Sequence, residues 1–222
     1  RWLDKALIRL CARFATFPTA QKDPNQMQLA PQFSLLPQLV FHLRRSQLLQ
    51  VFNCSPDETA FFRLVCARQA VSETLLMVQP SLIAYSPSAP AAPVPLDVAA
   101  CAPDRVLLLD TFFHIVVWYG DSVVRWRAEG LHRRPEYEYF ATMLRAPLEQ
   151  SRVALTTRLP APRFIECTQG GSQSRFLMAK LNPSLSHNNN NDPAAEPPIF
   201  SDDVTLSQFM NQLRKMVAME KL

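Results

Sequence analysis

The sequence predicts an α+β fold in which an all-helical domain is followed by a mixed sheet flanked by helices. Two observations lead to this prediction. Apolar residues recur at helical spacing through most of residues 1–80, and after Pro80 the pattern changes to short runs rich in β-branched and aromatic residues. A chain of 222 residues with 48% hydrophobic content is also large enough to bury two cores. We therefore predict two domains, over residues 1–80 and 81–222.

The clearest helix start in the first domain lies at Ser55-Pro56-Asp57-Glu58. Serine is a preferred N-cap, proline suits the first helical position, and a glutamate three residues after the cap can return a hydrogen bond to it. The run that contains Arg44 and Arg45 is predicted to form helical turns with a basic exposed face. Helices are predicted over residues 1–15, 36–49, 56–69 and 72–79.

Beyond residue 80, runs of β-branched and aromatic residues predict strands, and amphipathic runs predict helices. The prolines between Ser86 and Pro95 favour a stiff surface loop over a polyproline ligand. Residues 184–198 are polar and predict a mobile loop, and Asp202 and Asp203 after it are interpreted as helix-start residues. The predicted strands cover 82–85, 106–110, 112–119, 163–168 and 175–181, and the predicted helices cover 121–128, 136–144, 148–157 and 205–219.

Composition limits the class of protein. The net charge is +4, and the excess lies in residues 1–80, which hold nine Lys and Arg against five Asp and Glu. Such a bias suits an acidic partner or an anionic membrane, although a charge of this size usually marks only a solvated surface. Without long basic runs or interleaved aromatic residues, we expect no nucleic-acid binding. The chain starts with Arg1 rather than methionine, and residues 2–14 already have the pattern of a structured element, so we expect a piece of a longer protein. This first run is amphipathic and has no signal-peptide pattern, and no stretch is apolar enough to span a membrane. We therefore expect a soluble or peripheral protein.

Several kinds of chemistry find no matching residues. The cysteines have no metal-binding spacing and lie in apolar surroundings, so we interpret them as reduced core residues of a cytosolic protein and expect no metal. With only four glycines, the chain has no P-loop or dinucleotide motif, and it has no G-x-S-x-G elbow. We expect no nucleotide site and no hydrolytic site. The cysteines are Cys11, Cys54, Cys66, Cys101 and Cys167.

A double-glycine turn near the C-terminal end carries the most promising chemical group. Gly170 and Gly171 lead through Ser172, Gln173 and Ser174 into Arg175 and an apolar run. Glycine accepts a positive φ at little cost, so two in a row permit a sharp reversal. The turn can hold the arginine guanidinium at an edge and aim it at a partner, although an arginine in such a place is in most proteins a solvated surface residue.

Short motifs follow one another in order over nearly the whole chain. They are Phe33-Ser34-Leu35-Leu36-Pro37-Gln38, Phe41-His42-Leu43-Arg44-Arg45-Ser46, Leu49-Gln50-Val51-Phe52-Asn53, Ser55-Pro56-Asp57-Glu58, Asp110-Thr111-Phe112-Phe113, Pro135-Glu136-Tyr137-Glu138, Gly170-Gly171-Ser172-Gln173, Arg175-Phe176-Leu177, Asn182-Pro183-Ser184 and His187-Asn188-Asn189. Together these motifs resemble those of the GTPase-activating subunit of the COPII inner coat. The departures are modest: Cys54 stands where that family usually has an asparagine, and residues 22–30 and 193–198 diverge.

The resemblance implies a helical domain over residues 1–80 and a gelsolin-like domain over 81–222. In that family the gelsolin-like domain supplies an arginine finger in trans to a Sar-type small GTPase during endoplasmic reticulum to Golgi transport. By motif match the finger is Arg175, with Gly170, Gly171, Ser172 and Gln173 as protein-binding residues. The chain would then not be an enzyme on its own.

The same resemblance implies partners and a place in the cell. It implies a cargo-adaptor subunit and outer-coat subunits as partners, and a cytoplasmic protein held peripherally on endoplasmic reticulum membranes and COPII vesicles. A zinc site is expected in a part of the family that precedes Arg1. No cofactor is expected in this segment.

Two other functions stay open at this point. Tyr137, with Tyr139, Phe140 and Trp126, could form a platform for proline-rich peptides, although Phe140 and Trp126 also fit an ordinary helix core. A gelsolin-like fold alone would also suit a calcium-regulated actin-binding module, which leaves the preceding helical motifs unexplained.

Overall fold

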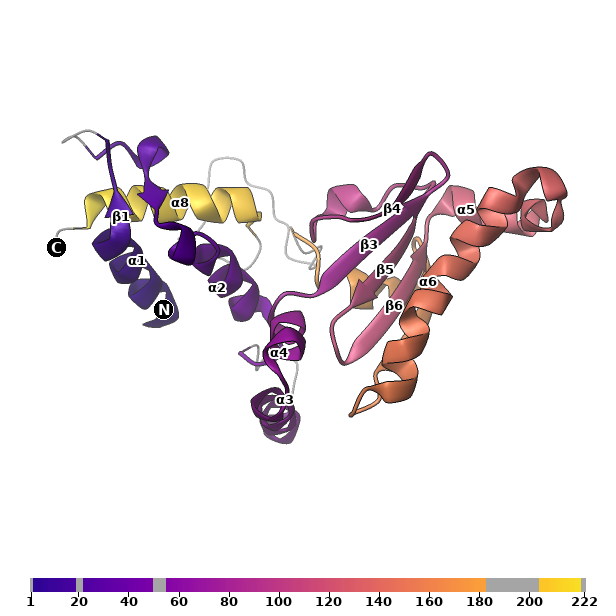
Figure 1. Ribbon diagram of the computed structural model, residues 1–222, viewed down its shortest axis with the longest axis horizontal. Helices are drawn as coiled ribbons and strands as arrows, with labels where there is room; N and C mark the ends of the chain where they lie inside the picture. Colours follow the sequence, from indigo (N-terminus) through magenta and orange to yellow (C-terminus); the bar gives the residue numbers. More distant parts are fainter. Residues whose placement is uncertain (1, 19–21, 50–54, 183–203, 221–222) are drawn as a thin grey trace.

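The computed structural model describes residues 2–18, 22–49, 55–182 and 204–220. Helices gather at one end of the molecule and a five-stranded sheet lies at the other, with two further helices between them (Figure 1). The α+β fold predicted from the sequence is confirmed. Among the described residues, no helix is both long and apolar enough to cross a membrane.

The helical end is built from α1 (Trp2–Phe14), α2 (Leu36–Arg45) and α8 (Leu206–Met219). Although α8 follows the sheet in sequence, it lies against α1 and α2 (Figure 1). Its apolar stripe drives this packing, because Phe209, Leu213 and Val217 are fully buried in one core with α1 and α2. Two short strands, β1 (Ala15–Thr16) and β2 (Gln28–Leu29), pair beside this core.

The helix α3 (Pro56–Arg68) begins at the predicted capping box. The Ser55 hydroxyl accepts a hydrogen bond from the Glu58 N–H, and the Glu58 carboxylate accepts one from the Ser55 N–H. The last helix also starts with a capping box, here between Thr205 and Gln208. The acidic pair Asp202-Asp203, predicted to serve this role, lies outside the described residues.

The sheet has the order β4-β3-β5-β6-β7. Neighbouring strands are antiparallel except β6 and β7, which are parallel and joined by helices α5 (Asp121–Ala128) and α6 (Glu138–Thr157). A parallel pair needs such a crossover, because a tight hairpin reverses the chain. The strands are β3 (Ser81–Ser86), β4 (Ala89–Pro93), β5 (Val106–Asp110), β6 (His114–Tyr119) and β7 (Arg163–Thr168).

The two faces of the sheet bury alternate residues of the same strands. In β6, Val116 and Trp118 face one core, which is covered by α7 (Arg175–Met178), whereas Ile115 and Val117 face the core covered by α5 and α6. Period two puts successive side chains on opposite faces, so a strand buried on both faces is apolar throughout. This explains the unbroken apolar run of β6.

Three predicted elements differ from the structure. The stretch from Ser86 to Pro95 was predicted as a loop, but contains the edge strand β4, whose prolines are tolerated because an edge strand has backbone groups without a ladder partner. The two predicted helices over 136–157 form one helix, α6, with Pro147 inside it. The apolar run after Arg175 was predicted as a strand and forms α7, because short apolar runs do not distinguish a strand from a buried helix.

The basic exposed face predicted for α2 is also wrong. Arg45 is buried and donates a hydrogen bond of 2.8 Å to the Leu181 carbonyl. Arg44 forms an ion pair with Asp4 of α1 at 3.2 Å. Both guanidiniums therefore join elements inside the molecule, and neither faces solvent as periodicity suggested.

Candidate functional site

The turn after β7 is shaped by its first glycine. Gly170 has a φ of +74°, a conformation that residues with a Cβ rarely adopt. The Gly171 N–H then donates to the Thr168 carbonyl, closing the turn, and a Cβ at position 171 would lie only 3.1 Å from that oxygen. A side chain would therefore strain the turn at both positions, through the backbone conformation at Gly170 and through crowding with the Thr168 carbonyl at Gly171.

Arg175 stands where this turn ends and α7 begins. A short 3-10 helix (Ser172–Ser174) leads directly into α7. The Arg175 side chain is exposed, and within the described ranges it makes no ion pair. Two residues later, Leu177 is fully buried in the sheet core. The guanidinium is thus open to solvent, and the backbone that carries it is anchored to the sheet core through Leu177.

The other predicted residues of the turn play different parts. Ser172 is exposed, whereas Gln173 is half-buried. The Gln173 Oε1 atom is buried and has no hydrogen-bond partner in the part of the chain that the structure describes. An unpaired buried amide oxygen is costly, so this side chain is a candidate to rearrange when another surface covers it.

Phe176, which the sequence motif already includes, lies at the base of Arg175 together with two residues that sequence reasoning missed, Arg163 and His114. The Phe176 ring lies 5.2 Å from the Arg175 guanidinium carbon and 5.2 Å from that of Arg163. The His114 ring lies 5.4 Å from the same phenyl ring. Burial lowers the pKa of His114, and the nearby charges of Lys180 and Arg163 lower it further. The neutral imidazole of His114 and the guanidiniums of Arg163 and Arg175 thus all lie next to the Phe176 ring.

Tyr137 is not part of this site. It is half-buried in the core between the sheet and α6, on the face opposite α7. Of the predicted aromatic cluster, Trp126 and Phe140 pack edge to face at 5.8 Å inside that core, whereas Tyr139 is 52% exposed. Tyr139 lines a groove of about 510 Å³ together with Pro87 of the loop before β4. Tyr137 and Tyr139 remain neighbours, with ring centres 6.2 Å apart, whereas Trp126 and Phe140 belong to the core and cannot form part of an open platform.

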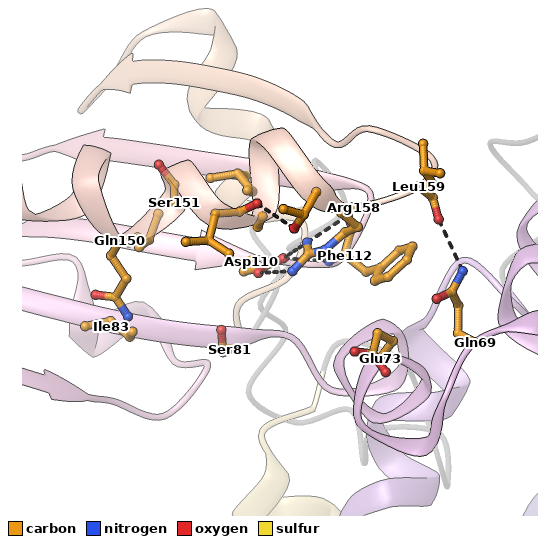
Figure 2. Close-up of a pocket in the computed structure, with 15 residues that line it drawn as sticks. Gln69, Glu73, Ser81, Ile83, Asp110, Phe112, Gln150, Ser151, Arg158 and Leu159 are labelled. Atoms are coloured by element: carbon orange, nitrogen blue, oxygen red, sulfur yellow. Dashed lines mark hydrogen bonds and ion pairs between the residues drawn. The ribbon is translucent and has the colours of Figure 1, made fainter.

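A cavity of about 600 Å³ lies between the sheet and the second half of α6, with Gln69 of the α3 C-cap and Glu73 of α4 (Val71–Val78) at its edge. Figure 2 shows the Arg158 guanidinium against the Asp110 carboxylate beside this cavity, and Gln69 of the α3 C-cap reaching across to the Leu159 carbonyl. Phe112, which follows Asp110, is fully buried with a φ of +73°. The Asp110-Thr111-Phe112-Phe113 motif is thus a structural joint, since Phe112 and Phe113 pack with residues of α3 and α4.

The described residues contain no group of three His, Cys, Asp or Glu side chains that could hold a metal ion. Four of the cysteines are free thiols, and Cys54 lies outside the described residues. Burial raises the pKa of Cys11 and of Cys167 to about 11. Both thiols therefore stay protonated at neutral pH, and neither is an activated nucleophile.

Comparison with known proteins places both halves of the chain. Residues 1–76 match the Sec23/Sec24 helical domain, and residues 87–177 match the gelsolin repeat. The chain is 48% identical to protein transport protein SEC23 F of Arabidopsis thaliana over 217 residues, and 45% identical to SEC23 C of the same plant. These alignments cover 97% and 98% of the chain.

The chain belongs to the Sec23/Sec24 family. It spans 28% of the length of these two relatives. The human COPII-coat protein Sec24c has the same fold, with a TM-score of 0.64 over 96% of the chain and 27% of Sec24c, at 16% sequence identity. In this Sec23/Sec24 chain, Asp110 and Arg175 both lie within the gelsolin repeat match, Arg175 close to its C-terminal end.

Proposed function

We propose that this chain is part of a COPII coat subunit that activates GTP hydrolysis by a Sar-type small GTPase, with Arg175 as an arginine finger in trans. The observation that carries the proposal is the setting of Arg175. Its guanidinium is exposed and makes no ion pair within the described ranges, while the next two residues anchor it to the sheet core. The relationship to the two SEC23 proteins supports the transport role.

An arginine in this setting suits phosphoryl transfer. The transition state spreads negative charge over the γ-phosphate oxygens and the bridging oxygen. A guanidinium placed in advance stabilises this charge more than it stabilises the ground state, and its planar fork can contact two oxygens at once. An arginine finger contributes about 10³ to 10⁵ in rate, or about 4–7 kcal/mol.

The proposal also assigns roles to the turn. Gly170 and Gly171 set the direction in which Arg175 leaves the sheet, and Ser172 and Gln173 lie on the surface that would meet the GTPase. The chain then carries no nucleotide site of its own, and the GTPase supplies nucleotide and magnesium. Such a subunit works in the cytoplasm, held peripherally on endoplasmic reticulum membranes and vesicles with a cargo-adaptor subunit and outer-coat subunits.

The test is single-turnover GTP hydrolysis by the GTPase, with the full-length subunit at saturating concentration. We expect Arg175→Ala to lower the maximal rate by at least 10³-fold and to leave the binding of the GTPase within a few-fold of wild type. Arg152→Ala, which removes an exposed arginine from α6 on the other face of the sheet, serves as the matched control. A near wild-type rate for Arg175→Ala would refute the proposal.

Contact with an anionic membrane is part of the same proposal, and the helical end offers a surface for it. Lys5, Arg9 and Arg13 are all exposed and recur every four residues, so they form one basic stripe along α1. Each basic residue near such a membrane contributes about 1 kcal/mol of attraction. Replacing all three with glutamine should reduce cosedimentation with phosphatidylserine vesicles. The buried Arg45 should not take part, and equal binding by the triple variant would exclude this face.

The groove beside Tyr139 favours a second candidate function, the binding of proline-rich peptides. Aromatic side chains bind the flat face of a polyproline helix, and this groove joins an exposed tyrosine to a wall of small residues in β4. Titration of a triple-proline peptide should show weaker binding after Tyr139→Ala, whereas Tyr137→Ala should have a smaller effect because Tyr137 is half-buried. Unchanged affinity in both variants would discard this function.

A further inference from the structure

The Phe176 ring lies between the exposed Arg175 guanidinium and two residues of the sheet, Arg163 and His114. Arg175 and Phe176 are neighbours in a helix, where consecutive side chains usually diverge. A distance of 5.2 Å between the guanidinium carbon and the ring centre therefore shows that the arginine bends back over the ring.

The sheet fixes the partners of this ring. His114 and Arg163 begin β6 and β7 and form the first pair of the parallel register. Val116, Trp118, Ile165 and Cys167 face the core under α7, so alternate residues place His114 and Arg163 on that same face. The Arg163 backbone N–H also donates to the Phe113 carbonyl at 2.9 Å. The backbone positions of His114 and Arg163, the two sheet residues next to Phe176, are thus fixed by strand pairing.

The chemistry of the group limits where Arg175 can go. Phenyl rings attract guanidiniums through their faces, and each such contact is stronger where water is excluded. The like charges of Arg163 and Arg175 repel each other. Within the described ranges neither arginine forms an ion pair, so no carboxylate offsets this repulsion. His114 adds no charge near neutral pH, because its pKa is lowered. The Arg175 guanidinium can therefore rest on the Phe176 ring, but it cannot move closer to β7, because the Arg163 guanidinium already lies there.

We propose that Phe176 is a positioning residue for Arg175 and that Arg163 holds the Phe176 ring in place. This inference rests on the proposed function and deepens it. The ring holds the guanidinium near its working position before the GTPase arrives, which reduces the conformational entropy lost when the finger docks. Phe176 itself contacts no nucleotide, and its effect passes entirely through Arg175.

The experiment compares single-turnover GTP hydrolysis by the full-length subunit and its GTPase as the subunit is titrated. Phe176→Leu keeps an apolar side chain against the core but removes the ring. We expect a maximal rate about 2- to 30-fold below wild type, the range that one cation–π contact provides, with the half-saturating concentration unchanged. Phe176→Tyr should restore the rate, because it restores the ring.

Arg163 provides the second pair of variants, at an exposed position where substitution leaves the core intact. Arg163→Gln should lower the maximal rate by a smaller factor, and Arg163→Lys should retain it, because lysine keeps the cation over the ring. If Phe176→Leu hydrolyses at the wild-type rate, or Phe176→Tyr fails to rescue it, the positioning role is wrong. If Phe176→Leu fails to fold by circular dichroism, equal rates for Arg163→Gln and wild type refute the proposal instead.

Arg175→Ala separates this inference from the function on which it rests. A wild-type rate for Arg175→Ala overturns the proposed function, and the positioning role with it. A large loss for Arg175→Ala beside unchanged rates for the Phe176 and Arg163 variants overturns the positioning role alone. In the double variant Arg175→Ala, Phe176→Leu, the second substitution should add no further loss, since a positioning residue has no effect without the group it positions.

Discussion

The Arg158 guanidinium meets the Asp110 carboxylate in parallel contacts of 2.8 and 2.9 Å, and this pair joins the end of α6 to the end of β5. Both side chains are largely shielded from solvent, with exposed fractions of 15% and 20%. The same carboxylate accepts the Phe112 N–H at 2.8 Å, and the guanidinium lies 4.8 Å from the Phe112 ring. One ion pair thus stabilises the left-handed residue at the joint between the sheet and the helices (Figure 2).

Removing both members of this pair should therefore cost less than the sum of removing each one alone. Asp110→Ala leaves a shielded guanidinium without its carboxylate and the Phe112 N–H without its acceptor, so we expect unfolding free energy to fall by about 2–4 kcal/mol. The double variant Asp110→Ala, Arg158→Met should lose less than the sum of the single variants. Urea denaturation of the four proteins measures this coupling, and strictly additive losses would contradict it.

Gly170→Ala tests whether the turn needs its positive φ. No atom lies within 4 Å of the added Cβ, so the cost comes from backbone conformation alone and should be about 1–2 kcal/mol. Asparagine tolerates the left-handed region better, and Gly170→Asn should cost less. Thermal unfolding of both variants gives the comparison. Equal stabilities for alanine, asparagine and glycine at this position would show that the turn does not depend on φ.

His42 should make the helical end sensitive to mild acid. Burial, with a further effect of the Arg45 charge, lowers the His42 pKa from its ordinary 6.5 to about 4. In the unfolded chain His42 is protonated below about pH 6.5, whereas in the folded chain it stays neutral down to about pH 4. The unfolding free energy is therefore highest above pH 6.5 and falls as the pH drops from 6.5 to 4. At pH 5 this loss should reach about 2 kcal/mol.

The measurement is urea denaturation of the wild type and of His42→Gln at pH 7.5 and pH 5. The wild type should lose about 2 kcal/mol more than His42→Gln between these two conditions. Parallel losses in both proteins would mean that His42 does not carry the acid sensitivity.

Much of this fold could be predicted from local patterns. The Ser55 capping box and the strand over 106–110 depend on neighbouring residues, and the structure has both where the sequence placed them. The candidate site was also suggested by a local signal, a double glycine followed by an arginine. Its residues were then given roles by resemblance, and those roles stay predictions.

The parts that were missed depend on contacts between distant residues. No pattern links Arg158 to Asp110, which lies 48 residues earlier, and nothing near Phe176 indicates that Arg163 and His114 share its ring. The Arg44 and Arg45 pair misled for the same reason, because Asp4 and the Leu181 carbonyl that bind them are far away in sequence. The register of β6 and β7 brings the site together, and register is a property of the whole sheet.

The binding of the full-length subunit to its GTPase in two nucleotide states tests the central claim most directly. An arginine finger binds the transition state more tightly than the ground state, so wild type should prefer the GDP–aluminium fluoride form to the form with a non-hydrolysable GTP analogue. Arg175→Ala should lose that preference while its affinity for the GTP-analogue form stays within a few-fold of wild type. An equal loss of affinity for both forms, or a retained preference, would contradict the account.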